Sequence, residues 1–176
     1  MMTSYLRKSM IFKTSIESTF ECSIERAFKT PMLCDITKVH TGFLFSPKVL
    51  YTTEDEDWGK IGSSKKVYVA KSLTQNGGFL FVDNILEREE NQYWKIQIDN
   101  FQEWMFGFYK FIGEWQTKKV GHKEVLVTYS YSMFSKNPFL FPLNWIFVKV
   151  FWRFYMQRVV ENIKTMAYNN EPYKFE

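Results

Sequence analysis

The sequence predicts an α+β fold in which an antiparallel sheet packs against one long C-terminal helix. Apolar and polar residues alternate along several segments, as in strands that bury one face. Polar residues recur every fourth position over residues 149–161, as in a helix with one wet stripe. Phe, Tyr and Trp make up 19% of the 176 residues. This composition excludes intrinsic disorder, because disordered chains lack large apolar side chains.

The first strand and the helices after it occupy the start of the chain. Residues 11–22 alternate between apolar and polar side chains and predict a half-buried strand. Ser23 is placed to cap a helix, which we expect to end near Pro31 because proline disfavours helix in the preceding residue. Residues 31–40 predict a second short helix with Gly42 just beyond its end.

The middle of the chain predicts six further strands joined by short turns. Gly77-Gly78 and Gly121-His122 are among the turn signals. Consecutive strands with short connections form an antiparallel meander with one wet face, and here the dry face is aromatic. The expected strands are residues 49–53, 65–72, 79–86, 93–101, 106–118 and 125–133.

The last element is a helix over residues 142–167. Its polar stripe of Lys149, Arg153, Gln157 and Glu161 is narrow, and aromatic residues cover the opposite side. A helix exposed on only a narrow strip needs a concave partner, and the meander is the only candidate in the chain. With no repeat or linker, we expect residues 1–176 to form one domain, with residues 1–9 as a short N-terminal extension.

This order of elements resembles that of the START-like superfamily, also called Bet v 1-like or SRPBCC, which includes polyketide cyclase/dehydrase-type proteins. Residues 20–28 (FECSIERAF) resemble the strand-to-helix start of that family, with Cys22-Ser23 in place of its usual proline. Residues 58–67 (WGKIGSSKKV) resemble its glycine-marked loop into the third strand. The resemblance covers residues 10–167. It implies a helix-grip fold, a curved sheet of about seven strands wrapped around the C-terminal helix, with an apolar cavity that binds lipids, polyketides, quinones or similar molecules.

Inward aromatic residues of the strands and the facing side of the helix form the binding-site hypothesis. Pockets for apolar ligands are lined mainly by such side chains, with a few polar groups that orient the ligand. The competing interpretation is that the same rings fill the core. The candidate binding residues are Trp94, Tyr109, Phe111, Trp115, Tyr129, Tyr131, Phe147, Phe151, Phe154, Tyr155, Asp83 and His40.

Two of these candidates carry the polar chemistry. Asp83 and Asn84 lie in a strand that is apolar on both parities, so one of them must point inward, and a buried carboxylate acts as a general acid or base. A structural hydrogen bond is the alternative role. His40 follows the second short helix, where it either binds a ligand or interacts with the helix dipole. The sequence has no motif for a metal, a cofactor or nucleophilic catalysis, so we expect neither metal nor cofactor.

Charge and cysteine content limit the partners. The net charge of +4 is spread along the chain, which argues against nucleic acid as a partner. Two cysteines, Cys22 and Cys34, and the lack of a signal-peptide run predict free thiols in the cytoplasm. Lys149 and Arg153 interrupt residues 139–156, so we expect no membrane span. The oligomeric state stays open.

We therefore expect binding of a small hydrophobic molecule without covalent chemistry. One alternative is a cyclase or dehydratase that uses Asp83, Tyr129 or His40 in the same cavity. Another is an interaction module, in which the aromatic residues 138–152 contact a partner protein or the periphery of a membrane.

Overall fold

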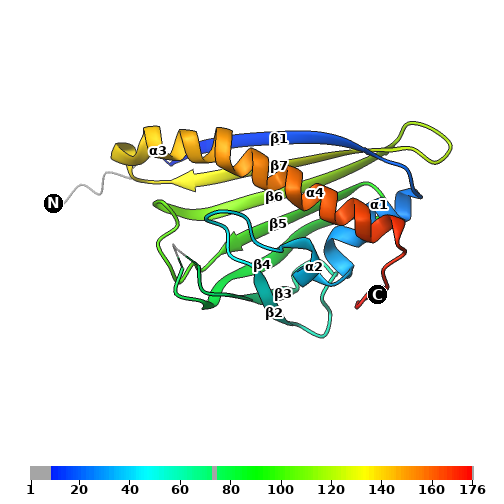
Figure 1. Cartoon of the computed structure of the whole chain (residues 1–176), viewed down its shortest axis with the longest axis horizontal. Helices are drawn as coiled ribbons and strands as arrows, with labels where there is room; N and C mark the ends of the chain where they lie inside the picture. The colour runs from blue at the N-terminus through cyan, green and yellow to red at the C-terminus, as the bar shows by residue number, and fades with distance from the viewer. Residues whose placement is uncertain (1–8, 73–74, 176) are drawn as a thin grey trace.

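A computed structural model describes residues 9–72 and 75–175. Seven strands form one antiparallel sheet in the order β1-β7-β6-β5-β4-β3-β2, and a long helical segment lies across it (Figure 1). Apart from Ser9, the expected N-terminal extension lies outside the described residues. The elements are β1 (Met10–Phe20), α1 (Ile24–Leu33), α2 (Ile36–Val39), β2 (Val49–Glu54), β3 (Ser64–Val69), β4 (Gly78–Glu89), β5 (Tyr93–Asp99), β6 (Phe108–Lys119), β7 (Val125–Ser135), η1 (Pro138–Leu140), α3 (Phe141–Ile146), η2 (Phe147–Phe151) and α4 (Trp152–Tyr168).

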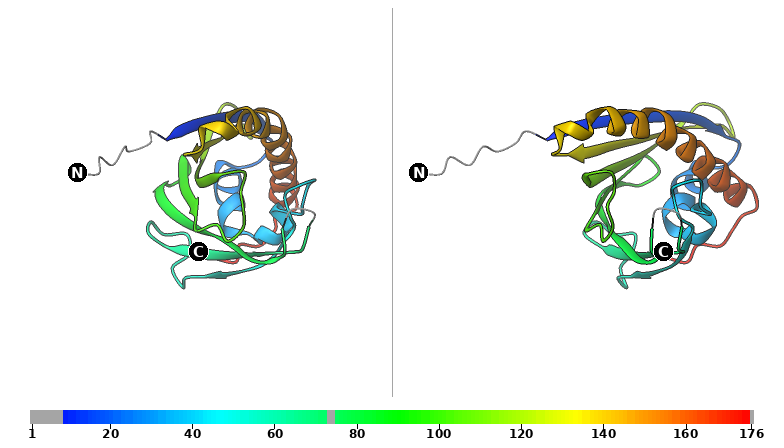
Figure 2. Two further views of the ribbon diagram at one scale, coloured as in Figure 1. Left: turned by 90° about the vertical axis from the view of Figure 1, so that its left-hand side faces the viewer. Right: turned by 60° about the vertical axis from the view of Figure 1, so that its left-hand side comes forward.

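The sheet curves around the C-terminal helix, and α1 and α2 lie within its curvature (Figure 2). This arrangement confirms the predicted helix-grip architecture, with two short helices after the first strand. Outward side chains of β1 alternate with buried ones such as Phe12, Ile16 and Phe20. The same alternation in the later strands lines the concave face with rings, because successive strand residues point to opposite faces.

Helix α1 does not end at Pro31 but continues to Leu33, which corrects the predicted boundary. Its start is as expected, since the Ser23 side chain accepts a hydrogen bond from the Arg26 backbone. Proline has no N–H, so the carbonyl of Ala27 four residues earlier loses its usual partner within the helix. The indole N–H of Trp115 donates to that carbonyl at 3.0 Å and replaces the missing bond. Consequently, the second helix is only the short α2.

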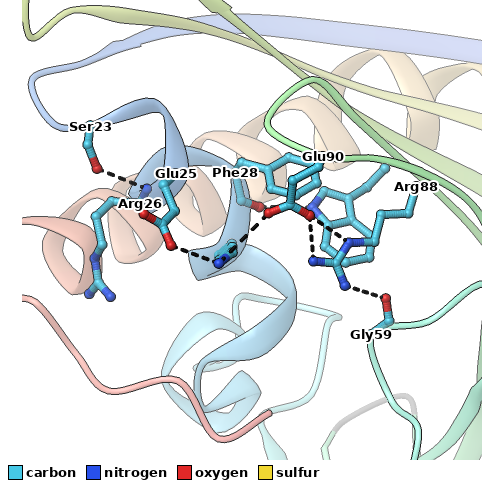
Figure 3. Close-up of polar contacts among 9 residues, drawn as sticks. Ser23, Glu25, Arg26, Phe28, Gly59, Arg88 and Glu90 are labelled. Carbon is cyan, nitrogen blue, oxygen red and sulfur yellow. Dashed lines mark hydrogen bonds and ion pairs between the residues drawn. The ribbon is translucent and has the colours of Figure 1, made fainter. Parts of the chain in front are cut away.

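Two further tryptophans hydrogen-bond to α1, one from β5 and one from the loop between β2 and β3. Trp94 and Trp58 donate indole hydrogen bonds of 2.9 Å to the carbonyls of Phe28 and Met32. Arg88 of β4 adds a hydrogen bond to the Gly59 carbonyl and an ion pair with Glu90 beside α1 (Figure 3). We call this region, from α1 to Trp58, Trp94 and Trp115, the sealed end of the molecule.

The C-terminal helical segment changes geometry along its length. It begins as the 3-10 turn η1, continues as α3, widens into the π-helical turn η2 and becomes regular again in α4. A π-helical turn holds more residues than an α-helical turn, so the residues after it are rotated relative to a continuous α-helix. Side chains of α4 that face the sheet include Tyr155, Met156 and Val159, all buried.

Candidate functional site

A cavity of about 110 Å³ lies between the concave face of the sheet and the helices. Its wall combines strands β2 to β7 with α1, α2, η2 and α4, and most of its side chains are apolar. Phe45, in the loop before β2, both lines the cavity and is 46% exposed, so this loop marks the mouth. The cavity is smaller than the apolar cavities of about 150 Å³ that bind benzene, so it has room for about one ring.

Ten of the twelve candidate residues lie on this wall. They come from β4 to β7, from the loop after α2 and from the C-terminal helical segment, as the alternation of the strands predicts. Their contact with a ligand is part of the proposed function. The ten residues are His40, Asp83, Trp94, Phe111, Trp115, Tyr129, Tyr131, Phe147, Phe151 and Tyr155.

The other two candidates do not line the cavity. Tyr109 is exposed because the register of β6 against β7 shifts between Phe108 and Lys110, and this bulge gives the inward position to Phe108. Phe154 is 58% exposed because the π-helical turn before it rotates the following residues, so that Tyr155 faces inward instead. Both predictions assumed that inward side chains keep their regular spacing along the whole strand or helix.

A lysine and an aspartate form a buried pair on the wall. Lys65 of β3 lies opposite Asp83 of β4 in the sheet register, and its Nζ is 3.6 Å from Asp83 Oδ2. The Lys65 ammonium also lies 4.1 Å from the centroid of the Trp58 ring. Burial lowers the pKa of Lys65 and raises the pKa of Asp83, and the attraction between the two opposes both shifts.

Hydroxyl and imidazole groups provide further polar contacts. His40 Nδ1 and the Tyr155 hydroxyl share a hydrogen bond of 2.6 Å, and Tyr129 donates to the Tyr131 hydroxyl at 3.1 Å. Burial, with a smaller contribution from the charge of Lys65, lowers the pKa of His40 to about 3. Burial also raises the pKa of Tyr155 to about 12. At neutral pH the imidazole and the phenol are therefore both uncharged.

Three buried polar atoms on this wall have no hydrogen-bond partner within residues 9–72 and 75–175. They are the acceptors Asp83 Oδ1 and Gln75 Oε1 and the donor Trp152 Nε1. Each side chain is more than nine-tenths buried. A buried polar atom without a partner is costly, so these atoms mark positions where a bound molecule would supply hydrogen bonds.

Comparison with solved structures identifies the architecture. The allergen Ara h 8.0201 matches with a TM-score of 0.67 at 14% identity, over 91% of this chain and 99% of that one. The chain has the Bet v 1-like fold. Norcoclaurine synthase from Thalictrum flavum, solved as a point mutant with a transition-state analogue, matches at 0.68 and 10% identity, over 93% and 98%. A protein of unknown function from Staphylococcus aureus, SA2116, matches at 0.69 and 9%, over 93% and 97%.

At such identities, likeness establishes the Bet v 1-like fold and nothing finer. No family model and no curated protein sequence matches the chain. The function must therefore be argued from the residues of the cavity.

Lys65 is the functional candidate that sequence reasoning missed. It shares a strand parity with Val67 and Val69, both buried, so the alternation of β3 already places a lysine on the dry face. A lysine at an apolar position of a Bet v 1-like strand is informative because lysine is almost never fully buried unless paired. Its partner Asp83 is one of two inward candidates, with Asn84, because the β4 sequence is apolar on both parities.

The described residues hold no cluster of three or more His, Cys, Asp or Glu side chains suited to a metal ion. Within the same ranges, no helix has the length and apolar character needed to cross a bilayer. Cys22 and Cys34 are both free thiols.

Proposed function

We propose that the chain binds a small apolar molecule that carries one hydrogen-bond donor, such as a hydroxyl group. The observation that carries this proposal is the buried Lys65–Asp83 pair on the wall of an apolar cavity, in which Asp83 Oδ1 has no hydrogen-bond partner in the described chain. Burial of the apolar part supplies about 25 cal/mol per Å², and the donor satisfies Asp83.

The size of the cavity narrows the ligand class. Space for about one ring favours a single-ring compound, a polyketide- or quinone-like unit, over a long-chain lipid. Aromatic walls favour ring stacking, since edge-to-face and offset ring pairs add to the free energy of burial. Trp152 and Tyr131, whose ring centroids are 5.3 Å apart, provide such surfaces.

A pair of probes of equal size tests the polar part of the proposal. 4-Propylphenol and butylbenzene have the same number of non-hydrogen atoms, but only the phenol carries a donor. By titration calorimetry, we expect the phenol to bind about ten-fold more tightly, which is the usual contribution of a hydrogen bond to a charged group. Equal affinity of the two probes would remove Asp83 from the proposal, and no binding of either would contradict a ligand-binding cavity.

A double variant provides the matched control. Replacing Lys65 with Met and Asp83 with Leu keeps the wall apolar and leaves neither charge unpaired. We expect this variant to bind butylbenzene as well as the original chain does, and to lose the preference for the phenol. If the preference persists in the double variant, the hydroxyl contacts another group.

Acid–base catalysis in the same cavity is the second candidate function. The cavity wall holds four polar groups that could transfer protons, Lys65, Asp83, His40 and Tyr129. Burial lowers the pKa of Lys65 and raises the pKa of Asp83, which favours the uncharged form of each. Norcoclaurine synthase from Thalictrum flavum, which shares the fold, was solved in complex with dopamine and hydroxybenzaldehyde.

Those two compounds provide an assay for chemistry. The chain is incubated with dopamine and hydroxybenzaldehyde, and products that form only with protein are sought by mass spectrometry. If side chains of the cavity wall catalyse the reaction, a product should form with the original chain and should not form with the Lys65→Met variant. Binding of either compound without any product would favour the binding function.

A further inference from the structure

The outer side of the C-terminal helical segment carries a stripe of exposed apolar side chains. Its members recur every three or four residues, the spacing of one helix face, and they face away from the cavity. Phe139, at one end of the stripe, is 89% exposed. We call this set the outer stripe: Phe139, Leu143, Ile146, Val150 and Phe154.

Aromatic and apolar residues beside the outer stripe extend the exposed surface. Phe141 and Trp145 are each 49% exposed on α3. Trp104, in the loop before β6, is 61% exposed, and its ring lies 5.1 Å from that of Phe106. The Phe106 ring in turn lies 4.6 Å from that of Phe147 in η2, so this loop packs against the helical segment.

The loop at the cavity mouth joins the same region. The Phe45 ring lies 5.5 Å from that of Phe151, and the neighbouring Leu44 is 68% exposed. Leu44 and Phe106 both have a positive φ, a backbone conformation that bulky residues rarely adopt. Residues in such conformations concentrate at ligand clamps and switch regions, so both loops have features of functional segments.

The charges along this segment are all positive. Residues 136–160 contain Lys136, Lys149, Arg153 and Arg158 and no Asp or Glu. All four cations are exposed, and none forms an ion pair with a carboxylate of the described chain. Elsewhere the acidic and basic residues are mixed, as in the run Glu54 to Asp57 followed by Lys60.

We propose that the outer stripe and its flanking cations bind the surface of membranes that contain anionic phospholipids. Helices that lie in the plane of a membrane combine an apolar face rich in Trp, Phe and Leu with Lys and Arg. Tryptophan prefers the membrane–water interface, and anionic headgroups attract unpaired cations. The edge of a protein interface is polar and mixed in charge, whereas residues 136–160 carry only basic charges. The nearby Glu103, in the loop before β6, accepts a hydrogen bond from Asn76.

This proposal stands independently of the ligand, because the outer stripe and its four cations lie outside the cavity. It places the mouth, marked by Phe45, beside the bilayer. An apolar ligand would then enter the cavity without crossing bulk water.

Vesicle flotation tests the proposal with the full chain. One set of vesicles is phosphatidylcholine alone, and the other contains about 30% phosphatidylserine. We expect the chain to float with the anionic vesicles, to bind the neutral ones at least several-fold more weakly, and to be released by high salt.

Two pairs of variants locate the binding surface. Phe139→Ser with Ile146→Ser removes apolar area from the outer stripe, and Ile61→Ser with Val120→Ser removes exposed apolar residues elsewhere. Arg153→Glu with Arg158→Glu reverses charges beside the stripe, and Lys118→Glu with Lys119→Glu makes the same change on the β6–β7 hairpin. We expect each stripe variant to reduce the vesicle-bound fraction at least ten-fold, and each control to leave it unchanged.

Three results would overturn the proposal. The first is no flotation with either vesicle. The second is equal loss of binding in the stripe and control variants, which would indicate a general charge effect. The third is self-association that the stripe variant abolishes, measured by light scattering without any vesicle binding, because the stripe would then be an interface between copies. Circular dichroism of every variant confirms that a lost signal is not lost folding.

Discussion

The two ends of the helix-grip sheet use aromatic side chains in opposite ways. At the sealed end, Trp58, Trp94 and Trp115 are buried, and each indole N–H donates to a carbonyl of α1. At the other end, around α3 and the loop before β6, Trp104 and Trp145 are exposed, and the buried Trp152 has no partner for its indole in the described chain (Figure 1).

Trp94 and Trp115 therefore both stabilise the fold and line the cavity, whereas under our two proposals the exposed rings and Trp152 are used for binding. A buried ring with a satisfied N–H contributes to stability, since it removes apolar area from water without leaving a polar atom unpaired. An exposed ring contributes little to stability, and a buried ring with an unsatisfied N–H costs free energy. Under our two proposals, the high aromatic content of the chain serves stability at the sealed end and binding at the other end.

Trp94→Ala gives the largest expected loss of stability. The ring is buried and stacked on Phe28 with centroids 4.9 Å apart, so its removal leaves a cavity and removes the hydrogen bond to the Phe28 carbonyl. We expect the free energy of unfolding to fall by about 4 kcal/mol. Trp145→Ala at the exposed end should change it by less than about 0.5 kcal/mol. Equal effects in urea denaturation would remove the distinction between the ends.

Lys65→Met is expected to cost about 3 kcal/mol, because it leaves the Asp83 carboxyl buried without its cation. Adding Asp83→Leu removes the stranded carboxyl, so the double variant should recover most of the loss. Urea denaturation of the two variants measures this coupling. A double variant as unstable as the single one would show that Lys65 acts through packing on Trp58 rather than through the pair.

Trp115→Phe is expected to cost about 1–2 kcal/mol by leaving the Ala27 carbonyl unpaired. In a Pro31→Ala background the backbone N–H of residue 31 supplies a partner within the helix, so the same change should cost less. A double-mutant cycle, measured by thermal or urea unfolding, gives the coupling. Additive effects would contradict our explanation for why α1 continues through Pro31.

His40 has an effect that is visible only as a pH dependence. Its pKa in the folded chain is about 3, below the usual 6.5, so the unfolded chain binds a proton that the folded chain does not. Stability is therefore complete above 6.5 and falls as the pH decreases toward 3. The midpoint of thermal unfolding should drop between about pH 7 and about pH 5, and less so in His40→Asn. An identical drop in both chains would assign it to other groups.

Strand alternation predicted the antiparallel meander and several inward residues of the cavity wall, whereas the curved helix-grip fold and its cavity were implied by the resemblance to the Bet v 1-like superfamily. Trp94, Phe111 and Tyr131 are inward because each lies on an apolar parity that no bulge interrupts. The same argument selected Asp83 as one of two candidates for the interior.

Prediction failed where the backbone leaves its regular period. Tyr109 lies at a bulge and Phe154 follows a π-helical turn, and neither irregularity has a local sequence signal. The predicted end of α1 at Pro31 was wrong for another reason. The hydrogen bond that compensates for the missing proline N–H comes from Trp115, which is far away in the sequence. Long-range contacts of this kind are decided by packing rather than by local propensity.

A crystal structure of the chain grown with 4-propylphenol tests the central claim most directly. The account predicts the phenol ring in the cavity, against Trp152 and Tyr131, with its hydroxyl within hydrogen-bond distance of Asp83 Oδ1. A cavity closed by its own side chains, or a phenol bound only at the outer surface, would contradict it.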